Sequence, residues 1–209
     1  SKIKDPGYIN QLLKICVENE INLIVPTIDT ELHLLSENVS LFNKKGIQLL
    51  VCNEDVNKIC NDKLNTHKFF NNNNIPSPSL YNLEEAEKKI EAGHHLFLKP
   101  SNGSSSNHTY KVQKLNELQF FYKYSDNMLI QDFIEGDEYT VDVLVDLDGR
   151  VRCAVPRLRI ETRAGEVSKA ITVNDPDIIK WSYKIANALD LSACCLTIQC
   201  IKNSNSLKF

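Results

Sequence analysis

The chain lacks three features that would each indicate a whole class of protein. No apolar run approaches the roughly 20 residues of a membrane span, and the amino terminus has no basic-then-apolar secretory pattern. No basic run is present, and Asp plus Glu outnumber Lys plus Arg by 27 to 24. These absences argue against a membrane protein, a secreted protein and a nucleic-acid surface. We therefore expect a cytoplasmic protein that binds a compact, anionic small molecule.

The seven cysteines are odd in number and form no C-x-x-C pair. Cys16, Cys52, Cys153 and Cys200 lie inside apolar segments, so we expect reduced cysteines in the core. No zinc-like Cys/His spacing and no Ser/His/Asp order is present, and His94-His95 is better explained as the entry to a strand. The sequence thus offers neither a zinc site nor a serine-hydrolase triad.

The first 60 of the 209 residues alternate between helical and strand patterns. Asp5-Pro6 begins a predicted helix, and a strand follows over residues 21–25. A second helix is ended by Gly46 before a strand over residues 47–51. Such alternation predicts a parallel sheet. The apolar stripes of the two helices are Ile9, Leu12, Leu13, Cys16 and Val17, then Leu32, Leu35, Val39 and Phe42.

A second unit begins near residue 60. The asparagines at positions 71–74 suit a helix end, and Ile75-Pro76-Ser77-Pro78 is an extended connector, because a residue before proline disfavours the helical conformation. Asn82 can cap the next helix. The predicted elements are helices from about residue 60 through Phe70, over 83–92 and over 116–124, and strands over 95–99 and 108–112.

From Met128 onward the pattern is that of antiparallel strands. Asp148-Gly149 predicts a two-residue hairpin turn, with a return strand over residues 151–160 and a later strand over 195–201. Asp175-Pro176 begins a helix. One predicted strand face holds Tyr139, Val141, Val143, Val145 and Leu147, and the other holds Glu138, Thr140, Asp142 and Asp146. The helix residues expected to face inward are Ile178, Ile179, Ile185, Ala186 and Leu189.

Residues 97–106 read Phe-Leu-Lys-Pro-Ser-Asn-Gly-Ser-Ser-Ser. Lys99 ends an apolar strand, so its charge needs an anion or solvent. Gly103 and the small Ser104, Ser105 and Ser106 let backbone N–H groups approach phosphate oxygens closely. A strand-end lysine that reaches solvent, followed by a Ser/Gly linker, is the alternative.

Residues 130–143 suit a nucleotide-binding hinge. An apolar run is followed by Gly136 and an alternating strand, so the main chain can hydrogen-bond an adenine edge. Glu138 is placed to accept from ribose hydroxyls, and the alternative is a solvated acid at the start of a strand.

Two further groups are candidates for substrate and metal. Arg157, Arg159 and Arg163 share strand parity if the strand extends that far, so they could point together at a carboxylate or phosphate. Pairing with Glu161, Glu166 or Asp142 is equally consistent. Gln199 is a lone amide in an apolar strand and needs partners.

The segments over 97–106 and 130–143 resemble the ATP-grasp superfamily, in particular the large chain of carbamoyl phosphate synthase and its carboxylate-amine ligase relatives. Residues 25–32 resemble the Rossmann-like domain that precedes that fold. The resemblance implies an α/β protein, α+β in its second half. A partial pre-ATP-grasp domain over 1–60 would precede two ATP-grasp subdomains over 61–127 and 128–209, with both ends of the natural sequence cut short.

The resemblance also implies roles for single residues. Lys63, Lys99 and the loop from Gly103 to Ser106 would contact the phosphates of ATP. Gln131 and the backbone of Asp132 and Ile134 would contact adenine, with Phe133 beside it and Glu138 on the ribose. Gln199 matches a ligand of Mg²⁺ or Mn²⁺, but the Glu-x-Asn motif that supplies the other protein ligands is absent.

The resemblance leads us to expect an ATP-dependent ligase. A carboxylate or bicarbonate would become an acyl phosphate, which ammonia or an amine then attacks, with an arginine of the 157–163 stretch on the substrate side. Residues 159–166 resemble a substrate-facing loop. The alternatives are a non-catalytic ATP- or ADP-binding module and a protein-interaction scaffold. The acceptor, whether bicarbonate, an amino acid or a peptide carboxylate, stays open, as does the oligomeric state.

Overall fold

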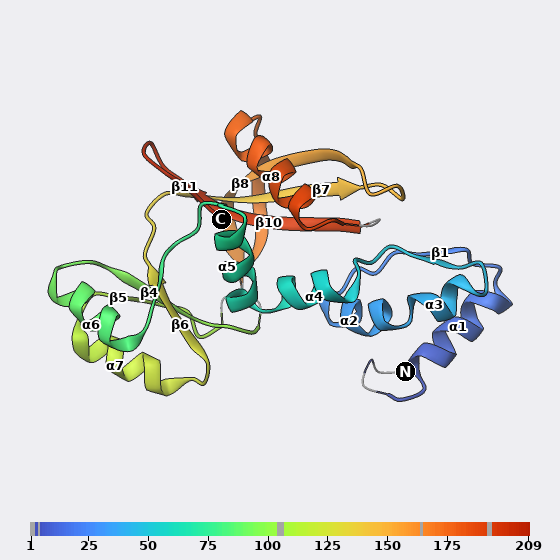
Figure 1. Ribbon diagram of the computed structural model, residues 1–209, viewed down its shortest axis with the longest axis horizontal. Helices are drawn as coiled ribbons and strands as arrows, with labels where there is room; N and C mark the ends of the chain where they lie inside the picture. Colours follow the sequence, from blue (N-terminus) through green and yellow to red (C-terminus); the bar gives the residue numbers. More distant parts are fainter. Residues whose placement is uncertain (1–2, 4, 104–106, 164, 192–193) are drawn as a thin grey trace.

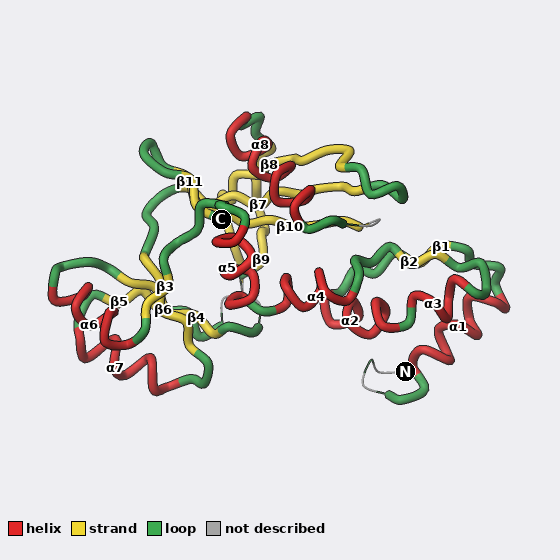
Figure 2. The backbone as a smooth tube through the Cα atoms, in the orientation of Figure 1, coloured by secondary structure: helices red, strands yellow, loops and turns green. Residues whose placement is uncertain are grey.

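The computed structural model describes the chain apart from residues 1–2, 4, 104–106, 164 and 192–193. Its elements form three parts, each with its own cluster of buried apolar side chains. The N-terminal part lies on one side of the molecule and a four-stranded sheet with two helices on the other, while a five-stranded sheet lies between and above them (Figures 1 and 2). Within the described residues, no helix combines the length and apolar character that crossing a bilayer requires.

The N-terminal part pairs two short parallel strands and packs helices on them, as the alternating pattern predicts. Leu35 and Phe42 are almost completely buried at its centre. Its elements are α1 (Tyr8–Glu18), β1 (Leu23–Ile24), α2 (Asp29–Glu37), α3 (Val39–Asn43) and β2 (Gln48–Leu49).

Three expectations for this part need correction. The strands are two residues long each, where five were predicted from residues 21–25 and 47–51. The second predicted helix is two helices, because the chain leaves the helical conformation at Asn38. Val17 is 54% exposed, since its side chain lies outside the buried stripe of α1. An additional helix, α4 (Glu54–Asn61), was not predicted and is capped by the Asn53 side chain.

The middle part is an antiparallel sheet of order β3-β6-β4-β5 with two helices on one face. Asp62 caps α5 by accepting from two backbone N–H groups, and Asn82 with Glu85 forms a capping box on α6. The elements are α5 (Lys63–Asn72), β3 (Leu80–Tyr81), α6 (Leu83–Glu91), β4 (Leu96–Pro100), β5 (Tyr110–Val112), α7 (Leu115–Tyr124) and β6 (Met128–Asp132).

The C-terminal part is an antiparallel sheet of order β11-β10-β7-β8-β9, with α8 against one face. Asp175 caps α8, and Pro176 occupies the first turn as predicted. The elements are β7 (Asp137–Val145), β8 (Val151–Arg163), β9 (Glu166–Thr172), α8 (Pro176–Ala188), β10 (Cys194–Lys202) and β11 (Leu207–Lys208).

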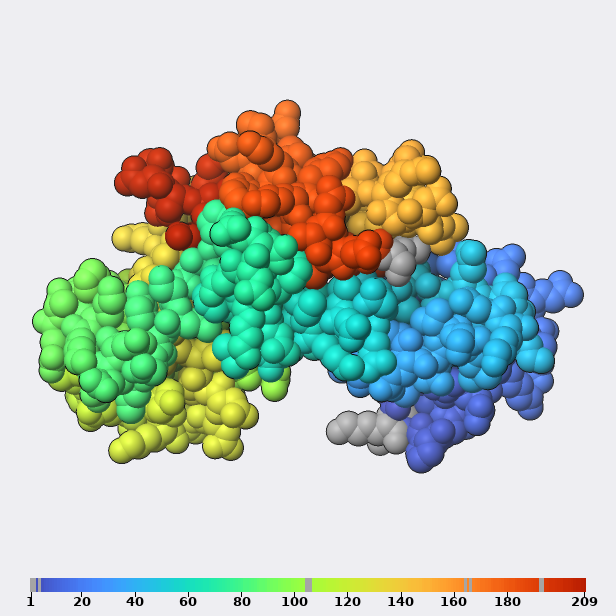
Figure 3. All heavy atoms as spheres, in the orientation of Figure 1, coloured from blue at the N-terminus to red at the C-terminus, as the bar shows by residue number. Residues whose placement is uncertain are grey.

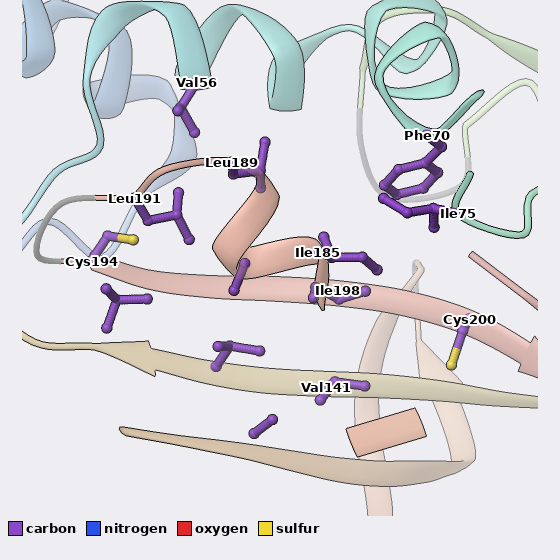
Figure 4. Packing of buried hydrophobic residues seen from close by; sticks show 14 of the residues in the cluster. Val56, Phe70, Ile75, Val141, Ile185, Leu189, Leu191, Cys194, Ile198 and Cys200 are labelled. Atoms are coloured by element: carbon purple, nitrogen blue, oxygen red, sulfur yellow. The ribbon is translucent and has the colours of Figure 1, made fainter. Parts of the chain in front are cut away.

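The core of this part is shared with earlier helices. Phe70 of α5 and the following Ile75 lie beside Ile185 and Ile198, and Val56 of α4 joins the same cluster (Figure 4). Helices α4 and α5 therefore lie at the centre of the molecule, in contact with all three parts (Figure 3). This packing sets where α5, and so Lys63, lies relative to both sheets.

The C-terminal sheet differs from expectation on its hairpins. A substrate-facing loop was expected over residues 159–166, but residues 159–163 are the end of β8 and Glu166 begins the unpredicted strand β9. Leu147, expected to continue the apolar face of the strand, is 63% exposed because β7 ends at Val145. Thr140 lies on the polar face but is buried, between two arginine–carboxylate pairs. All seven cysteines are described and free, but Cys60, Cys153 and Cys195 are exposed rather than in the core.

Gly136 is required by a close backbone approach. A Cβ at this position would lie 2.6 Å from the carbonyl oxygen of Lys202 and 2.9 Å from its carbonyl carbon. Backbone atoms cannot move aside as the end of a side chain can. Glycine thus lets the connection between β6 and β7 pass directly over the end of β10.

We predict that Gly136→Ala destabilises the fold by about 1–3 kcal/mol, the usual cost of forcing extra atoms into a packed site. Thermal or urea unfolding measures this change. The neighbouring Glu135→Ala is the control, since the Glu135 side chain is exposed and only its backbone oxygen is bonded, to Asn203. Equal stability of the two variants would contradict the close approach.

Candidate functional site

The start of α5 is joined to the end of β4 by hydrogen bonds of Lys63. Its backbone N–H donates to the carbonyl oxygen of Ser101 at 2.9 Å. Its Nζ donates to the carbonyl oxygen of Gly103 at 2.8 Å and, more weakly, to that of Ser101 at 3.4 Å. Burial lowers the pKa of Lys63. A cation and a helix amino terminus therefore meet the loop that follows β4.

Lys99 lies near the same end of β4. Leu96 and Leu98 are fully buried in the core of the four-stranded sheet, so the alternation of the strand turns Lys99 to the opposite face. Burial, and then the charge of Lys63, lower the pKa of Lys99 to about 8. Among the described residues, Lys99 has no acidic partner. Two cations thus lie close together, and the described acid that acts on them is Asp62, whose charge raises the pKa of Lys63.

His67 joins this group and was not singled out from the sequence. It lies one turn after Lys63 on α5, on the same helix face. Burial and the charge of Lys99 lower its pKa. Its ring nitrogens contact the Asn71 amide at 2.9 Å and the Ser77 hydroxyl at 3.4 Å. The i, i+4 spacing from Lys63 is the sequence signal that could have identified it.

The hinge segment lies next to Lys99 on the same sheet. Gln131 is buried and pairs across the strands with Phe97, two residues before Lys99. The Asp132 carboxylate accepts from the Tyr81 hydroxyl at 2.7 Å and the Ser79 N–H at 3.2 Å, so its side chain holds β3 in place. The Ile134 N–H has no acceptor among the described residues.

An aromatic contact covers this edge of the sheet. The Phe133 ring lies 6.5 Å from that of Phe97, centroid to centroid, and the Lys111 ammonium lies 3.9 Å from the centre of the Phe133 ring. Lys111 was not predicted from the sequence. Only strand pairing, which places Lys111 opposite Phe97, brings it to Phe133.

The C-terminal sheet holds the other predicted residues, and it holds them in ion pairs. Arg159 Nη1 donates to Glu138 at 3.0 Å, and Arg163 Nε donates to Glu161 at 3.1 Å. Arg157 bonds Asp142 through two nitrogens, at 2.6 and 3.0 Å. Two register irregularities interrupt the strand between Arg159 and Arg163. The three arginines therefore have three separate partners rather than one common focus.

Gln199 lies on the open face of β10, in cross-strand register with Thr140, which in turn opposes Arg157. In the described part of the chain, no three His, Cys, Asp or Glu side chains are placed to hold a metal ion together. On the neighbouring strands β7 and β8, the hydroxyl oxygen of Thr140 and the Nε of Arg159 are buried without a hydrogen-bond partner among the described residues.

The predicted residues thus form two groups. Lys63, Lys99 and Gly103 come together at the end of β4, with Gln131 on the neighbouring strand. Glu138 and Arg159 line a separate cavity of about 310 Å³ on the C-terminal sheet, together with Gly136, Asp137, Ile160, Glu161 and Thr162. Residues 133–136 connect the groups. Ser104, Ser105 and Ser106 lie outside the described residues.

Comparison with known proteins agrees with this fold. Residues 60–196 match the ATP-grasp domain, and residues 1–50 match the N-terminal domain of PylC-like proteins. The structure resembles a biotin carboxylase complex from Campylobacter jejuni with a TM-score of 0.78 and 18% identity, covering 100% of this chain and 52% of that one. The expected fold, a pre-ATP-grasp part followed by ATP-grasp sheets, is confirmed.

Two curated relatives are longer than this chain, which matches only part of each of them. A carbamoyl-phosphate synthase from Methanobrevibacter smithii is 22% identical over 144 residues, which cover 66% of this chain and 39% of the synthase. D-alanine–D-alanine ligase B from Clostridium perfringens is 26% identical over 151 residues, which cover 64% of this chain and 50% of the ligase. This chain therefore spans half the length of these relatives or less.

The low pKa of Lys99 predicts how anion binding depends on pH. A bound polyphosphate raises the pKa of Lys99 above its free value of about 8, so binding near pH 8 takes up a proton. Affinity should be flat below this pH and should fall above it, as Lys99 loses its charge. Calorimetry with tripolyphosphate in two buffers of different ionisation enthalpy measures the proton uptake.

Lys99→Arg is the matched variant, because arginine keeps its charge throughout this range. It should take up fewer protons than the parent protein on binding tripolyphosphate at pH 8, because the titration of the ligand itself is common to both. If the uptake were as large in this variant as in the parent protein, Lys99 would not be the group that titrates.

Proposed function

Because the chain belongs to the ATP-grasp family, we propose that it carries the nucleotide-binding part of an ATP-dependent ligase. The proposed reaction converts a carboxylate or bicarbonate into an acyl phosphate, which ammonia or an amine then attacks. The two curated relatives, a carbamoyl-phosphate synthase and a D-alanine–D-alanine ligase, are both named for reactions of this general kind. Since ATP-grasp ligases share their nucleotide half and differ at the acceptor, we assign no particular substrate.

The observation that supports this proposal best is the group at the end of β4. Lys63 bonds the Gly103 carbonyl oxygen at 2.8 Å, and Lys99 beside it has a pKa of about 8 and no acidic partner among the described residues. Two neighbouring cations, of which Lys99 lacks an acidic partner among the described residues, favour a ligand that carries several negative charges. The polyphosphate of ATP has this property, so the residues fit this part of the nucleotide.

The hinge fits the base of the nucleotide. We propose that Gln131 and the backbone of Asp132 and Ile134 contact adenine, with Phe133 beside the ring. The Ile134 N–H, which has no acceptor among the described residues, is available to a ring nitrogen. The Asp132 N–H already donates to Ser79 at 3.1 Å, so the carbonyl oxygen of Asp132 is the atom left for adenine.

The bound nucleotide would supply the phosphoryl group. Lys63, Lys99 and loop N–H groups would stabilise the negative charge that develops during transfer, because donors already in place cost no reorganisation. We also propose that the loop continues this role through Ser104, Ser105 and Ser106. Arg157, Arg159 and Arg163 stay candidates for the substrate side, although each has an acidic partner here.

The metal part of the expectation has less support. Magnesium prefers six oxygen ligands and usually relies on carboxylates, whereas the described residues offer the single amide of Gln199 on its strand. We propose Gln199 as one ligand of Mg²⁺ or Mn²⁺. The residues present do not make a complete site, so no step is assigned to the metal.

The same observation favours a second candidate, a module that binds ATP or ADP without turnover. It requires Lys63, Lys99 and Glu138 but no metal-dependent chemistry. The two candidates agree on nucleotide binding and differ on whether the bound ATP then gives up a phosphoryl group.

The nucleotide site predicts that Lys99→Ala weakens ATP binding by roughly 30-fold or more, since removing one partner of a desolvated charge pair typically costs at least about 2 kcal/mol. Calorimetry measures the affinity. Lys68→Ala is the control, because Lys68 is exposed on the same helix. Unchanged ATP affinity in Lys99→Ala, with the fold intact by thermal melting, would contradict the site.

The ligase proposal predicts release of phosphate from ATP that depends on an added carboxylate. Bicarbonate, amino acids and peptides are tested in turn, each with ammonia or an amine. Lys99→Ala should abolish the release. If the protein binds ATP but releases no phosphate with any member of the panel, the binding-only module is the better description.

A further inference from the structure

Arg159 differs from the other two arginines of β8 in its burial. Its side chain is 10% exposed, whereas the Arg163 side chain is 80% exposed and the Arg157 side chain 32%. Arg157 and Asp142 satisfy one another through two hydrogen bonds. Arg159 instead divides its donors between two acceptors, which indicates a different role.

One donor of Arg159 holds Glu138 and another holds a turn. Nη1 donates to the Oε2 oxygen of Glu138 at 3.0 Å, and Nη2 donates to the Gly165 carbonyl oxygen at 2.8 Å. Gly165 lies in the tight turn between β8 and β9, with a φ of +79°. The guanidinium group is therefore fixed at both sides, and Glu138 is fixed through it.

Only one oxygen of Glu138 is used. No described residue bonds its Oε1, and the Glu138 side chain is 56% exposed at the wall of the 310 Å³ cavity. An exposed glutamate normally samples several rotamers, and fixing it costs side-chain entropy. Here Arg159 has already restricted the side chain, so the free oxygen is held ready for a ligand.

The unpaired Nε–H of Arg159 is a second indication of a ligand. It is buried and has no hydrogen-bond partner among the described residues. Buried donors are nearly always paired in folded proteins, and an unpaired one is costly. A ligand oxygen in the cavity that Arg159 and Glu138 share would satisfy it.

We propose that Arg159 is a positioning residue for Glu138, and that the pair together selects ribonucleotides over deoxyribonucleotides. Glu138 Oε1 accepts from a ribose hydroxyl, and Arg159 holds the carboxylate in the orientation that this requires. The proposal rests on the nucleotide-binding function proposed above. It assigns Arg159 to the nucleotide rather than to the acceptor substrate, and it makes the β8–β9 turn part of ribose recognition.

The test compares ATP with 2′-deoxy-ATP and 3′-deoxy-ATP by calorimetry. The parent protein should prefer ATP over at least one of them by roughly tenfold, the effect of one hydrogen bond to a charged group. In Arg159→Gln this preference should fall towards one. Glu138→Gln should lose it equally, and the double variant should lose no more than either single change, because the two residues act as one unit.

Two variants separate positioning from general damage. Arg159→Lys keeps the charge but has no rigid fork to reach both Glu138 and Gly165, so it should keep only part of the preference. Arg150→Gln should keep all of it, since Arg150 is exposed and pairs with Asp148 in the β7–β8 hairpin, outside the proposed unit. Thermal melting monitors the fold of each variant, and Arg159→Lys serves if Arg159→Gln is unfolded.

Other outcomes overturn the inference in recognisable ways. If Arg159→Gln weakens all three nucleotides equally, Arg159 acts on the phosphates or on the fold. If Glu138→Gln loses the preference and Arg159→Gln keeps it, Glu138 needs no positioning partner. If the parent protein binds ATP without preferring the ribose, this inference fails while the proposed function stands. If it binds no nucleotide, both fail.

Discussion

Lys63 donates from its ammonium group to the Gly103 carbonyl oxygen at 2.8 Å and so holds a second cation beside Lys99. Keeping these charges partly buried is costly, because desolvation and mutual repulsion both favour the neutral amines. Stabilising contacts elsewhere in the fold offset this unfavourable free energy. Helix α5, which begins at Lys63, is capped by Asp62 and packs Phe70 into the core of the C-terminal sheet. The cation pair is therefore positioned by the capped and packed helix α5 rather than by an acidic partner of Lys99.

The two sheets differ in whether their cationic side chains are paired with acids. At the end of β4 Lys99 lacks an acidic partner among the described residues, whereas on β7 and β8 every arginine of the 157–163 stretch has one. The first arrangement favours an incoming anion, and the second orients side chains for a polar ligand. The connection through Gly136 joins them, and its close approach to Lys202 ties its path to the end of β10.

Local patterns predicted much of this structure. The proline-initiated helix α8, the Asn82 cap and the parallel pairing of β1 with β2 follow from short-range rules, and they are confirmed. Strand β9 was not predicted, and its first residue, Glu166, falls in the stretch that was expected to be a loop. His67 and Lys111 were missed because their roles depend on neighbours distant in sequence, Lys99 and Phe133. The domain limits at residues 60 and 127 and the site roles themselves stay predictions.

By itself, the sequence determined where the chemistry could lie. Lys99 at the end of an apolar strand, followed by a Gly/Ser loop, and Glu138 at the start of an alternating strand are local features, visible without coordinates. Only the tertiary structure decided which charges meet. It placed Lys63 beside Lys99 and Arg159 on Glu138, because strand register and helix packing, rather than sequence distance, set the separation of two side chains.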